Sequence, residues 1–367
     1  MEEIKLPPLR EFLFSLCGVM SVSGFEERGQ AALRSMLAPY FDEMETDAVG
    51  NHLFWKRCGK PNVPTVVVDT HFDEIGLLVT EVLEGGFLRV APVGGLDPSI
   101  LQASDVVIYG KEILRGVIVS IPPHLRSAKD KEKLPSAEEV MVDTGWQGDI
   151  AALRETVPVG TPIGFAPAYS VLSGGVHGER SVAGKSFDNK ACGAAAAYAL
   201  AAIPNESLAA DVCLLFSSYE ETNRLGGVAS AMYRIKPEYA MVIDVNLARV
   251  PDAPRAETVP FGKGISISIS AATDRRLTRM TRTLCEEEQI PFSTVAAPSS
   301  TGTNAATVNL VGAGVPVVDV GLPLKNMHTY NEIISMKDVS ALCDLVRAFV
   351  CSRTLAEAFA PSEKEVR

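Results

Sequence analysis

Two kinds of hydrophobic spacing divide the first part of the chain. Residues 9–20 place apolar side chains at the intervals of a helix, and Ser23 with Glu26 has the form of a capping box that would begin a second helix. Strand-like runs follow at 52–56 and 65–69, and the second (Thr-Val-Val-Val-Asp) is typical of a strand buried on both faces. The pattern therefore predicts helices followed by the first strands of a covered sheet.

Between residues 76 and 168 the pattern changes to short β-rich runs broken by Gly and Pro pairs. No long helical pattern occurs there, and the predicted strands are 77–80, 87–90, 105–109 and 114–119. A charged stretch at 126–139 is most simply a solvated loop. These features predict a small, separate β domain.

Beyond Gly184 helices and strands alternate again. Helices are predicted at 188–202, after Gly226, at 275–289 and at 336–358, and strands at 212–218, 239–244, 265–269 and 315–320. Such alternation builds a sheet covered by helices on both faces. We therefore predict an α/β protein in which a three-layer α/β/α domain, residues 1–75 and 169–367, is interrupted by the β-rich segment 76–168.

Composition narrows the possible partners. The 367 residues carry a formal net charge of -11, so the chain lacks the basic surface that attracts nucleic acids and anionic membranes. The first ten residues include acidic residues and two prolines where a secretory signal needs a basic start and an apolar run. Seven scattered cysteines, none in a CxxC motif, favour free thiols in a reducing compartment. We expect a cytoplasmic protein with no nucleic-acid and no membrane partner.

His71 and Asp73 are the first candidate site residues. They follow the apolar run 65–69, and side chains two residues apart on an extended chain share a face. Asp73 can therefore accept one imidazole N–H and leave the other ring nitrogen free to bind a metal ion. An isolated HxD sequence is more often a strand-end histidine with a satisfying carboxylate, so this pair needs support from elsewhere in the chain.

Four further acids and a second histidine occupy similar places. Asp188 opens an alanine-rich helix, where the plain interpretation is a helix N-cap. Glu220 and Glu221 end one predicted core strand, Asp244 closes the next, and His328 lies just beyond the last. Taken singly, the two glutamates are typical of solvent-facing loop charges.

The shared position of these residues outweighs their separate interpretations. Except for Asp188, they lie at or just past the C-terminal ends of predicted strands, the edge along which open α/β sheets form their sites. With Asp188, two histidines and four carboxylates supply N and O ligands for zinc, cobalt or manganese and leave one carboxylate over as a base. This set of ligands predicts a two-metal hydrolase.

Several separate motifs also resemble one known family. They are His71-x-Asp73-Glu74-Ile75-Gly76, Phe187-Asp188-Asn189-Lys190, Glu220-Glu221, Val242-Ile243-Asp244, His328 with Glu332, and, in the inserted segment, Gly94-Gly95 and Val142-Asp143-Thr144-Gly145. In order and spacing, over nearly the whole chain, they are similar to the tetrahedral (TET) aminopeptidases. That family includes glutamyl aminopeptidases and members once labelled endoglucanases.

The resemblance implies a set of metal ligands. Asp188 would bridge two divalent ions, and the peptide bond that follows it would be cis. One ion would also be held by His71 and Asp244, and the other by Glu221 and His328. Zinc or cobalt would be the expected metals, with manganese as a further candidate.

The resemblance also implies a base and a mode of assembly. Glu220 would be the general base, and Asp73 would complete the catalytic residues by orienting His71. The inserted domain, small and β-barrel-like, would mediate dimerisation. In the family the dimers often assemble into twelve-subunit tetrahedra, so a homo-oligomer is expected.

Three segments depart from the family's usual sequence. The chain has Asp188-Asn189-Lys190 in place of Asp-Asp-Arg or Asp-Asn-Arg, and Gly302-Thr303-Asn304 in place of Gly-Thr-Asp. Neither change removes a predicted ligand. The third segment, residues 222–227, replaces Val-Gly-Leu-Arg-Gly-Ala close to the expected substrate cavity, where it bears on side-chain preference.

The predicted function is a two-metal aminopeptidase that releases N-terminal residues from short peptides. An amidase or deacylase on the same metal scaffold, an endoglucanase-type glycoside hydrolase and a non-catalytic binding protein are the alternatives. A glycosidase holds two carboxyl groups roughly 5 to 9.5 Å apart across the scissile bond. On an extended stretch, the neighbouring Glu220 and Glu221 would point to opposite faces, and the histidines would have no role.

Overall fold

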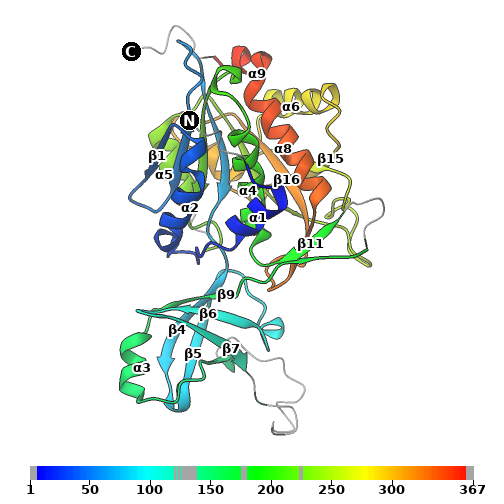
Figure 1. Ribbon diagram of the computed structural model, residues 1–367. Helices are drawn as coiled ribbons and strands as arrows, with labels where there is room; N and C mark the ends of the chain where they lie inside the picture. Colours follow the sequence, from blue (N-terminus) through cyan, green and yellow to red (C-terminus); the bar gives the residue numbers. More distant parts are fainter. Residues whose placement is uncertain are drawn as a thin grey trace.

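The computed structural model describes residues 6–119, 121, 125, 139–174, 180–222 and 226–360. Figure 1 shows a larger body of helices and strands from which a smaller β structure projects. The predicted α/β fold with an inserted barrel-like β structure is confirmed. Within the described ranges, no helix is both long and apolar enough to cross a bilayer. The predicted loop 126–139 lies outside the described residues except for Glu139.

The larger body is built on one eleven-stranded sheet in the order β1-β2-β12-β3-β13-β16-β17-β11-β10, with β14 paired to β16 and β15 to β14. Its strands are β1 Glu43–Thr46, β2 His52–Lys56, β3 Thr65–His71, β10 Ser170–Val171, β11 Ser181–Gly184, β12 Asp211–Ser217, β13 Tyr239–Leu247, β14 Ile265–Ser270, β15 Phe292–Ala297, β16 Val317–Lys325 and β17 Glu332–Ser335. The neighbours β12, β3, β13 and β16 run parallel. Their C-terminal ends therefore lie along one edge of the sheet.

Helices cover both faces of this sheet. One face carries α1 Leu9–Cys17, α2 Gln30–Leu37, α4 Phe187–Ala201, α6 Arg275–Glu287, α8 Met336–Cys351 and α9 Arg353–Ala358, and the other carries α5 Gly226–Ile235 and α7 Ala305–Val308. A hydrophobic core lies on each face of the sheet, and successive side chains of β3 point to opposite faces. Val66 and Val68 lie in the core beneath α1 and α4, and Val67 lies in the core beneath α5 and α7.

The alanine-rich helix α4 lies at the centre of the first layer and is buried almost all round. Its small side chains let neighbouring elements approach closely, and at Gly193 the neighbours are too close for any side chain. A Cβ atom there would lie 2.4 Å from the Phe216 ring and 3.0 Å from Thr70 Oγ1. This close packing fixes the N-terminal end of α4, where Asp188 lies, against the sheet.

The smaller structure is a closed barrel in the order β4-β5-β8-β7-β6-β9. Its strands are β4 Gly76–Val82, β5 Phe87–Val93, β6 Asp105–Tyr109, β7 Ile113–Val119, β8 Met141–Asp143 and β9 Pro162–Phe165, and a short helix, α3 Ile150–Thr156, packs on it. The sequence predicted neither β8, β9 nor α3. Because Leu77 pairs with Ile163, the chain enters and leaves the barrel at neighbouring points.

The predicted capping box at Ser23 is wrong. Gly24 has a φ of +86°, and Phe25 precedes the first turn, a 3₁₀ helix at Glu26–Gly29. Ser23 Oγ instead lies 3.3 Å from Thr222 Oγ1, and the Glu26 carboxylate accepts the Tyr219 N–H at 3.1 Å. Ser23 and Glu26 therefore contact residues almost 200 positions away in the sequence and do not cap a local helix.

Several element ends also differ from prediction, and three of them have a clear structural cause. Strand β13 does not close at Asp244 but continues to Leu247, because β16 runs beside it and pairs there through Leu324. Strand β16 correspondingly extends to Lys325. The predicted helix 336–358 is two helices, since the Ser352 hydroxyl caps α9 by accepting the Leu355 N–H.

Candidate metal centre

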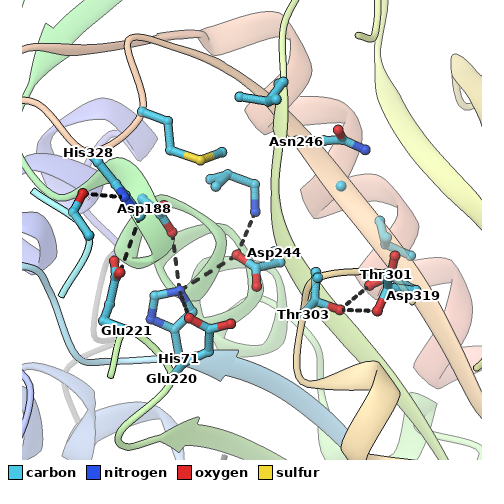
Figure 2. A pocket seen from close by; sticks show the side chains of 17 residues that line it. His71, Asp188, Glu220, Glu221, Asp244, Asn246, Thr301, Thr303, Asp319 and His328 are labelled. Carbon is cyan, nitrogen blue, oxygen red and sulfur yellow. Dashed lines mark hydrogen bonds and ion pairs between the residues drawn. The ribbon is translucent and has the colours of Figure 1, made fainter. Parts of the chain in front are cut away.

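The sheet brings the six predicted ligand and base residues into one cavity of about 400 Å³ (Figure 2). Four come from or follow the parallel strands β3, β12 and β13, one follows β16, and one lies in the first turn of α4. The residues are His71, Asp188, Glu220, Glu221, Asp244 and His328. Five of them lie at or near the C-terminal ends of the strands, where the sequence placed them, and Asp188 joins them from the start of α4.

One group of ligand atoms surrounds Nε2 of His71. Asp188 Oδ1 lies 3.1 Å from this nitrogen and Asp244 Oδ1 lies 3.6 Å from it. The other ring nitrogen, Nδ1, lies 3.0 Å from the carbonyl oxygen of Asp73 and 3.5 Å from its carboxylate. A proton on Nδ1 leaves Nε2 free to bind a cation beside two carboxylates.

A second group surrounds Nε2 of His328. The other carboxylate oxygen of Asp188, Oδ2, lies 3.4 Å from this nitrogen, and Glu221 Oε2 lies 3.2 Å from it. Nδ1 of the ring donates to the carbonyl oxygen of Gly95 at 2.9 Å. The two oxygens of Asp188 therefore face two different histidines, as Figure 2 shows.

These distances fit two metal ions. Ligands of a tetrahedral zinc ion lie about 2.1 Å from the metal and therefore about 3.4 Å from one another. The four distances around the two histidines lie between 3.1 and 3.6 Å. Glu221 Oε1 is buried and has no hydrogen-bond partner among the described residues. The N and O donors suit zinc, cobalt or manganese.

The N-cap interpretation of Asp188 is wrong. The residue lies inside the first turn of α4 with non-helical backbone angles, and its carboxylate faces the two histidines. Its backbone N–H donates to Glu332 Oε2 at 3.0 Å, and its peptide bond to Asn189 is cis, as the family resemblance implied. Asn189 Nδ2 donates to the Ile243 carbonyl oxygen, which ties this turn to β13.

Glu220 lies close to the first group without belonging to it. Its Oε2 is 3.9 Å from His71 Nε2, farther than the nearest atoms of Asp188 and Asp244. Burial raises the pKa of Glu220 to about 8, with His71 opposing the shift and Asp244 adding to it. Bound cations would lower this pKa again by favouring the anion. Glu220 can therefore hold or release a proton at the edge of the ligand cluster.

The geometry expected for the two glutamates is wrong. They lie in a turn beyond β12, not on an extended stretch, and both carboxylates line the cavity. Tyr219, just before them, has a φ of +64°. Their backbone N–H groups donate to the two carboxylate oxygens of Asp73, at 3.1 Å for Glu220 and 3.0 Å for Glu221.

Asp73 therefore contacts both His71 and the turn that carries Glu220 and Glu221. It accepts from His71 and from the glutamate turn, and Glu26 holds the preceding N–H of that turn. Sequence reasoning anticipated that Asp73 would hold His71, but through its carboxylate, whereas the hydrogen bond goes to its carbonyl oxygen and the carboxylate lies 3.5 Å away. It did not anticipate the contact with the glutamate turn. It named Gly95 only as part of a family motif and missed its contact with His328, because a backbone carbonyl leaves no side-chain signal. Of the remaining histidines, His52 packs against Phe72 outside the cavity, and His124 and His177 lie outside the described residues.

The parallel-strand edge with its histidine and carboxylate cluster defines a metal-dependent hydrolase on an α/β scaffold. Residues 50–345 match the model of the family described as M42 glutamyl aminopeptidase. The chain belongs to this M42 family, whose members are aminopeptidases and therefore hydrolases. The resemblance to TET aminopeptidases drawn from the motifs is confirmed.

Three relatives illustrate the similarity. The chain is 29% identical to a lysyl aminopeptidase of Pyrococcus furiosus over 333 residues, which cover 90% of this chain and 93% of the relative. The solved structure of the Pyrococcus horikoshii TET1 peptidase is 26% identical, with a TM-score of 0.80 over 94% of this chain and 99% of that one. A TET aminopeptidase from Thaumarchaeota archaeon SCGC AB-539-E09 has the same fold, with a TM-score of 0.86 at 24% identity, covering 96% and 98%.

Proposed function

We propose that the protein is a two-metal aminopeptidase that removes N-terminal residues from short peptides. One observation carries the proposal: the two carboxylate oxygens of Asp188 face separate histidines, each with a further carboxylate. His71 and Asp244 would hold one ion, and Glu221 and His328 the other. A shared carboxylate between two such groups is the arrangement expected when two ions act on one bond.

Two divalent ions would lower the pKa of a water molecule and polarise the scissile carbonyl. Glu220 would take the proton from this water and deliver it to the leaving amine. Its position supports this role, since its carboxylate lies beside the ligands yet farther from His71 than they do. Asp73 would keep both His71 and the glutamate turn in place for this transfer.

The cavity offers a place for a free substrate α-amine beside the metal ligands. The four carboxylates around the two histidines would balance the charge of two divalent ions, and the amine nitrogen would bind beside one ion and donate to a neighbouring carboxylate. Such recognition would restrict cleavage to the first peptide bond. We place this activity in the cytoplasm, where the scattered thiols of the sequence would stay reduced.

Self-association is the other part of the proposal. Structures of the P. horikoshii TET1 peptidase are described as a tetrahedron or a large octahedral shell. In this chain the barrel projects away from the catalytic body and carries exposed apolar side chains, including Ile113 and Val117. We propose that the barrel forms a dimer interface and that the dimers assemble further, up to twelve subunits.

Turnover of simple substrates tests the proposed reaction. The chelated protein should be inactive on aminoacyl anilides and regain activity with zinc, cobalt or manganese at two ions per subunit. N-acetylated versions of the same anilides should not be cleaved. Hydrolysis of acetylated but not free amines would favour the amidase or deacylase, and release of reducing sugar from glucans would favour the glycoside hydrolase.

A pair of histidine variants provides the control for metal content. His71→Asn should lose one ion per subunit, because it removes a ligand nitrogen from the first group. His52→Asn changes an equally buried histidine that lies outside the cavity, so it should keep both ions. Equal metal content in the two variants would refute the assignment.

A further inference from the structure

The cavity extends beyond the proposed metal ligands to a further acidic residue, Asp319. In Figure 2, Asp319 lies with Thr301 and Thr303 on the side of Asp244 that faces away from His328. In the sheet Asp319 on β16 pairs with Val242 on β13, two residues before Asp244. Asp319 and Asp244 therefore share a sheet face, with Cα atoms about 8 Å apart.

The neighbouring strand explains why this part of the sheet is polar. Strand β14 has the sequence Ile-Ser-Ile-Ser-Ile-Ser, so its serines all point to one face. Ile265 and Ile267 enter the hydrophobic core, whereas Ser266 and Ser268 are buried on the opposite face. Ser268 hydrogen-bonds to the Asp319 side chain. An alternation that buries serines beside a cavity provides a polar lining, not a packed core.

Asp319 is a buried carboxylate without a cation. Its side chain is 4% exposed, and Thr303 donates to its Oδ1 at 2.7 Å. No Lys or Arg of the described residues forms an ion pair with it. Burial raises the pKa of this carboxyl group to about 6, so it is mostly ionised at neutral pH. Buried charges in proteins are normally paired, which leaves this one suited to a cationic ligand.

We propose that Asp319 is a specificity-determining residue that selects peptides with lysine or arginine at the N-terminus. The inference rests on the proposed aminopeptidase function and names its substrate class. With the reacting carbonyl near His71 and Asp244, the side chain of the first residue would extend along the sheet face towards Asp319. A lysine stem of four carbons reaches about 6 Å, which suits the separation of the two aspartates.

The cavity also has apolar walls, which suit such a side chain. Val245, Leu247 and Met327 line it together with the polar groups. Long cationic side chains place their methylene stems on apolar surface and their charged ends on polar partners. Thr303 holds the acceptor in place, so Asp319 needs little rearrangement to receive the ammonium or guanidinium group.

The test compares lysyl and norleucyl aminomethylcoumarin amides, because norleucine has the lysine stem without the charge. The metal-loaded wild type should have a kcat/KM at least about 10-fold higher for the lysyl substrate. In Asp319→Asn, which keeps the size of the side chain and an acceptor for Thr303, this ratio should fall to about one. The norleucyl kcat/KM should stay within about threefold of wild type, because that substrate makes no charge contact.

Asp69→Asn is the matched control. Asp69 is also a buried aspartate on a core strand, and it accepts from Asn304 at 2.9 Å, but it does not line the cavity. Its substitution should leave the lysyl-to-norleucyl ratio unchanged, whatever it does to stability. Circular dichroism of both variants checks that each is folded.

Each other outcome overturns the assignment. Equal losses on both substrates in Asp319→Asn would mean that Asp319 acts on the α-amine or only holds the loop of Thr303. An unchanged ratio, or a wild type that prefers norleucine, would mean that it does not select the side chain. Calorimetric binding of L-lysine and L-norleucine separates this idea from the proposed reaction. If the protein turns over no substrate but binds L-lysine more tightly than L-norleucine, and Asp319→Asn removes this preference, only the proposed peptidase reaction is refuted. If the wild type binds the two amino acids equally, the proposed role of Asp319 is refuted.

Discussion

Glu220 and Glu221 are adjacent in sequence, yet their carboxylates have different neighbours. Glu221 lies 3.2 Å from His328, within ligand distance of the second group, whereas Glu220 lies 3.9 Å from His71. The two backbone N–H groups are held by one residue, Asp73. A turn, not strand alternation, therefore separates the two side chains. This difference leads to opposite expectations for the two glutamine variants.

Glu220→Gln should keep both metal ions and lose activity. The amide retains the size of the side chain but cannot accept the proton, so the rate should fall on the order of 10²–10⁴-fold. Glu221→Gln should instead release one ion, because it weakens the second group. Metal analysis after dialysis, beside the turnover number, measures both effects. Loss of an ion from Glu220→Gln with both retained in Glu221→Gln would reverse the two roles.

Asp73→Asn should lower activity although the residue need not touch a metal. Its two carboxylate oxygens accept the N–H groups of Glu220 and Glu221, and an amide offers only one acceptor oxygen. The unpaired N–H would displace the turn, with a loss of about 10–100-fold in activity or metal affinity. Titration of zinc into the chelated variant, with activity measured in parallel, checks this. Wild-type values for both would show that the turn is positioned by other contacts.

The candidate site residues could be predicted from the sequence by their positions after strands. Each proposed ligand is a His, Asp or Glu that follows an apolar run or opens a helix, and this pattern is visible even when the end of the strand is predicted a few residues wrongly. The supporting contacts had no comparable signal. Gly95 contributes a carbonyl oxygen to His328 from a position 233 residues away, and Glu26 was assigned to a local cap. Only the folded chain brings these groups to the site.

The elements were predicted best where packing and local pattern agree. Strand β2 occupies the predicted residues 52–56, and β6 occupies 105–109. Prediction failed where a partner strand or a capping residue decided the boundary, as at the end of β13 and at Ser352. Short strands such as β8 and β9 have too few residues for a period to show, and they form because the barrel supplies neighbours on both sides.

Helix α4 gives an element-scale prediction about packing. Gly193→Ala would place a Cβ atom 2.4 Å from the Phe216 ring, so the helix must move and stability should fall by about 1–3 kcal/mol. Gly226→Ala is the control, because none of the residues that the structure describes places an atom within 4 Å of its added Cβ atom. Alanine there should be neutral or stabilising by up to about 1 kcal/mol. Urea unfolding followed by circular dichroism compares them, and equal stabilities would show that α4 shifts without cost.

For the whole molecule, the barrel is joined to the catalytic site as well as to the sheet. Gly95 follows β5 of the barrel and accepts from His328, so the inserted structure helps to orient a proposed metal ligand. Deleting the barrel would therefore damage the site along with any interface. Surface substitutions provide the cleaner test of self-association, since they leave Gly95 in place.

Two side chains on the outer face of β7 provide that test. Ile113 is 70% exposed and Val117 is 41% exposed, and residues four apart on a strand point the same way. If the barrel forms the dimer interface, the double variant Ile113→Glu and Val117→Glu would place two charges in an apolar contact on each subunit. Burying these charges without partners costs several kcal/mol, so the dimer should dissociate at micromolar concentration.

Light scattering coupled to size exclusion measures the mass of each species. Leu310→Glu is the control, because Leu310 is 78% exposed on the catalytic body and lies outside the barrel. This control should keep the wild-type mass, and every variant should keep its activity per subunit, since none of the changed residues lines the metal cavity. A monomeric wild type would refute self-association. An oligomer that persists in the barrel variant but dissociates in Leu310→Glu would move the interface to the catalytic body.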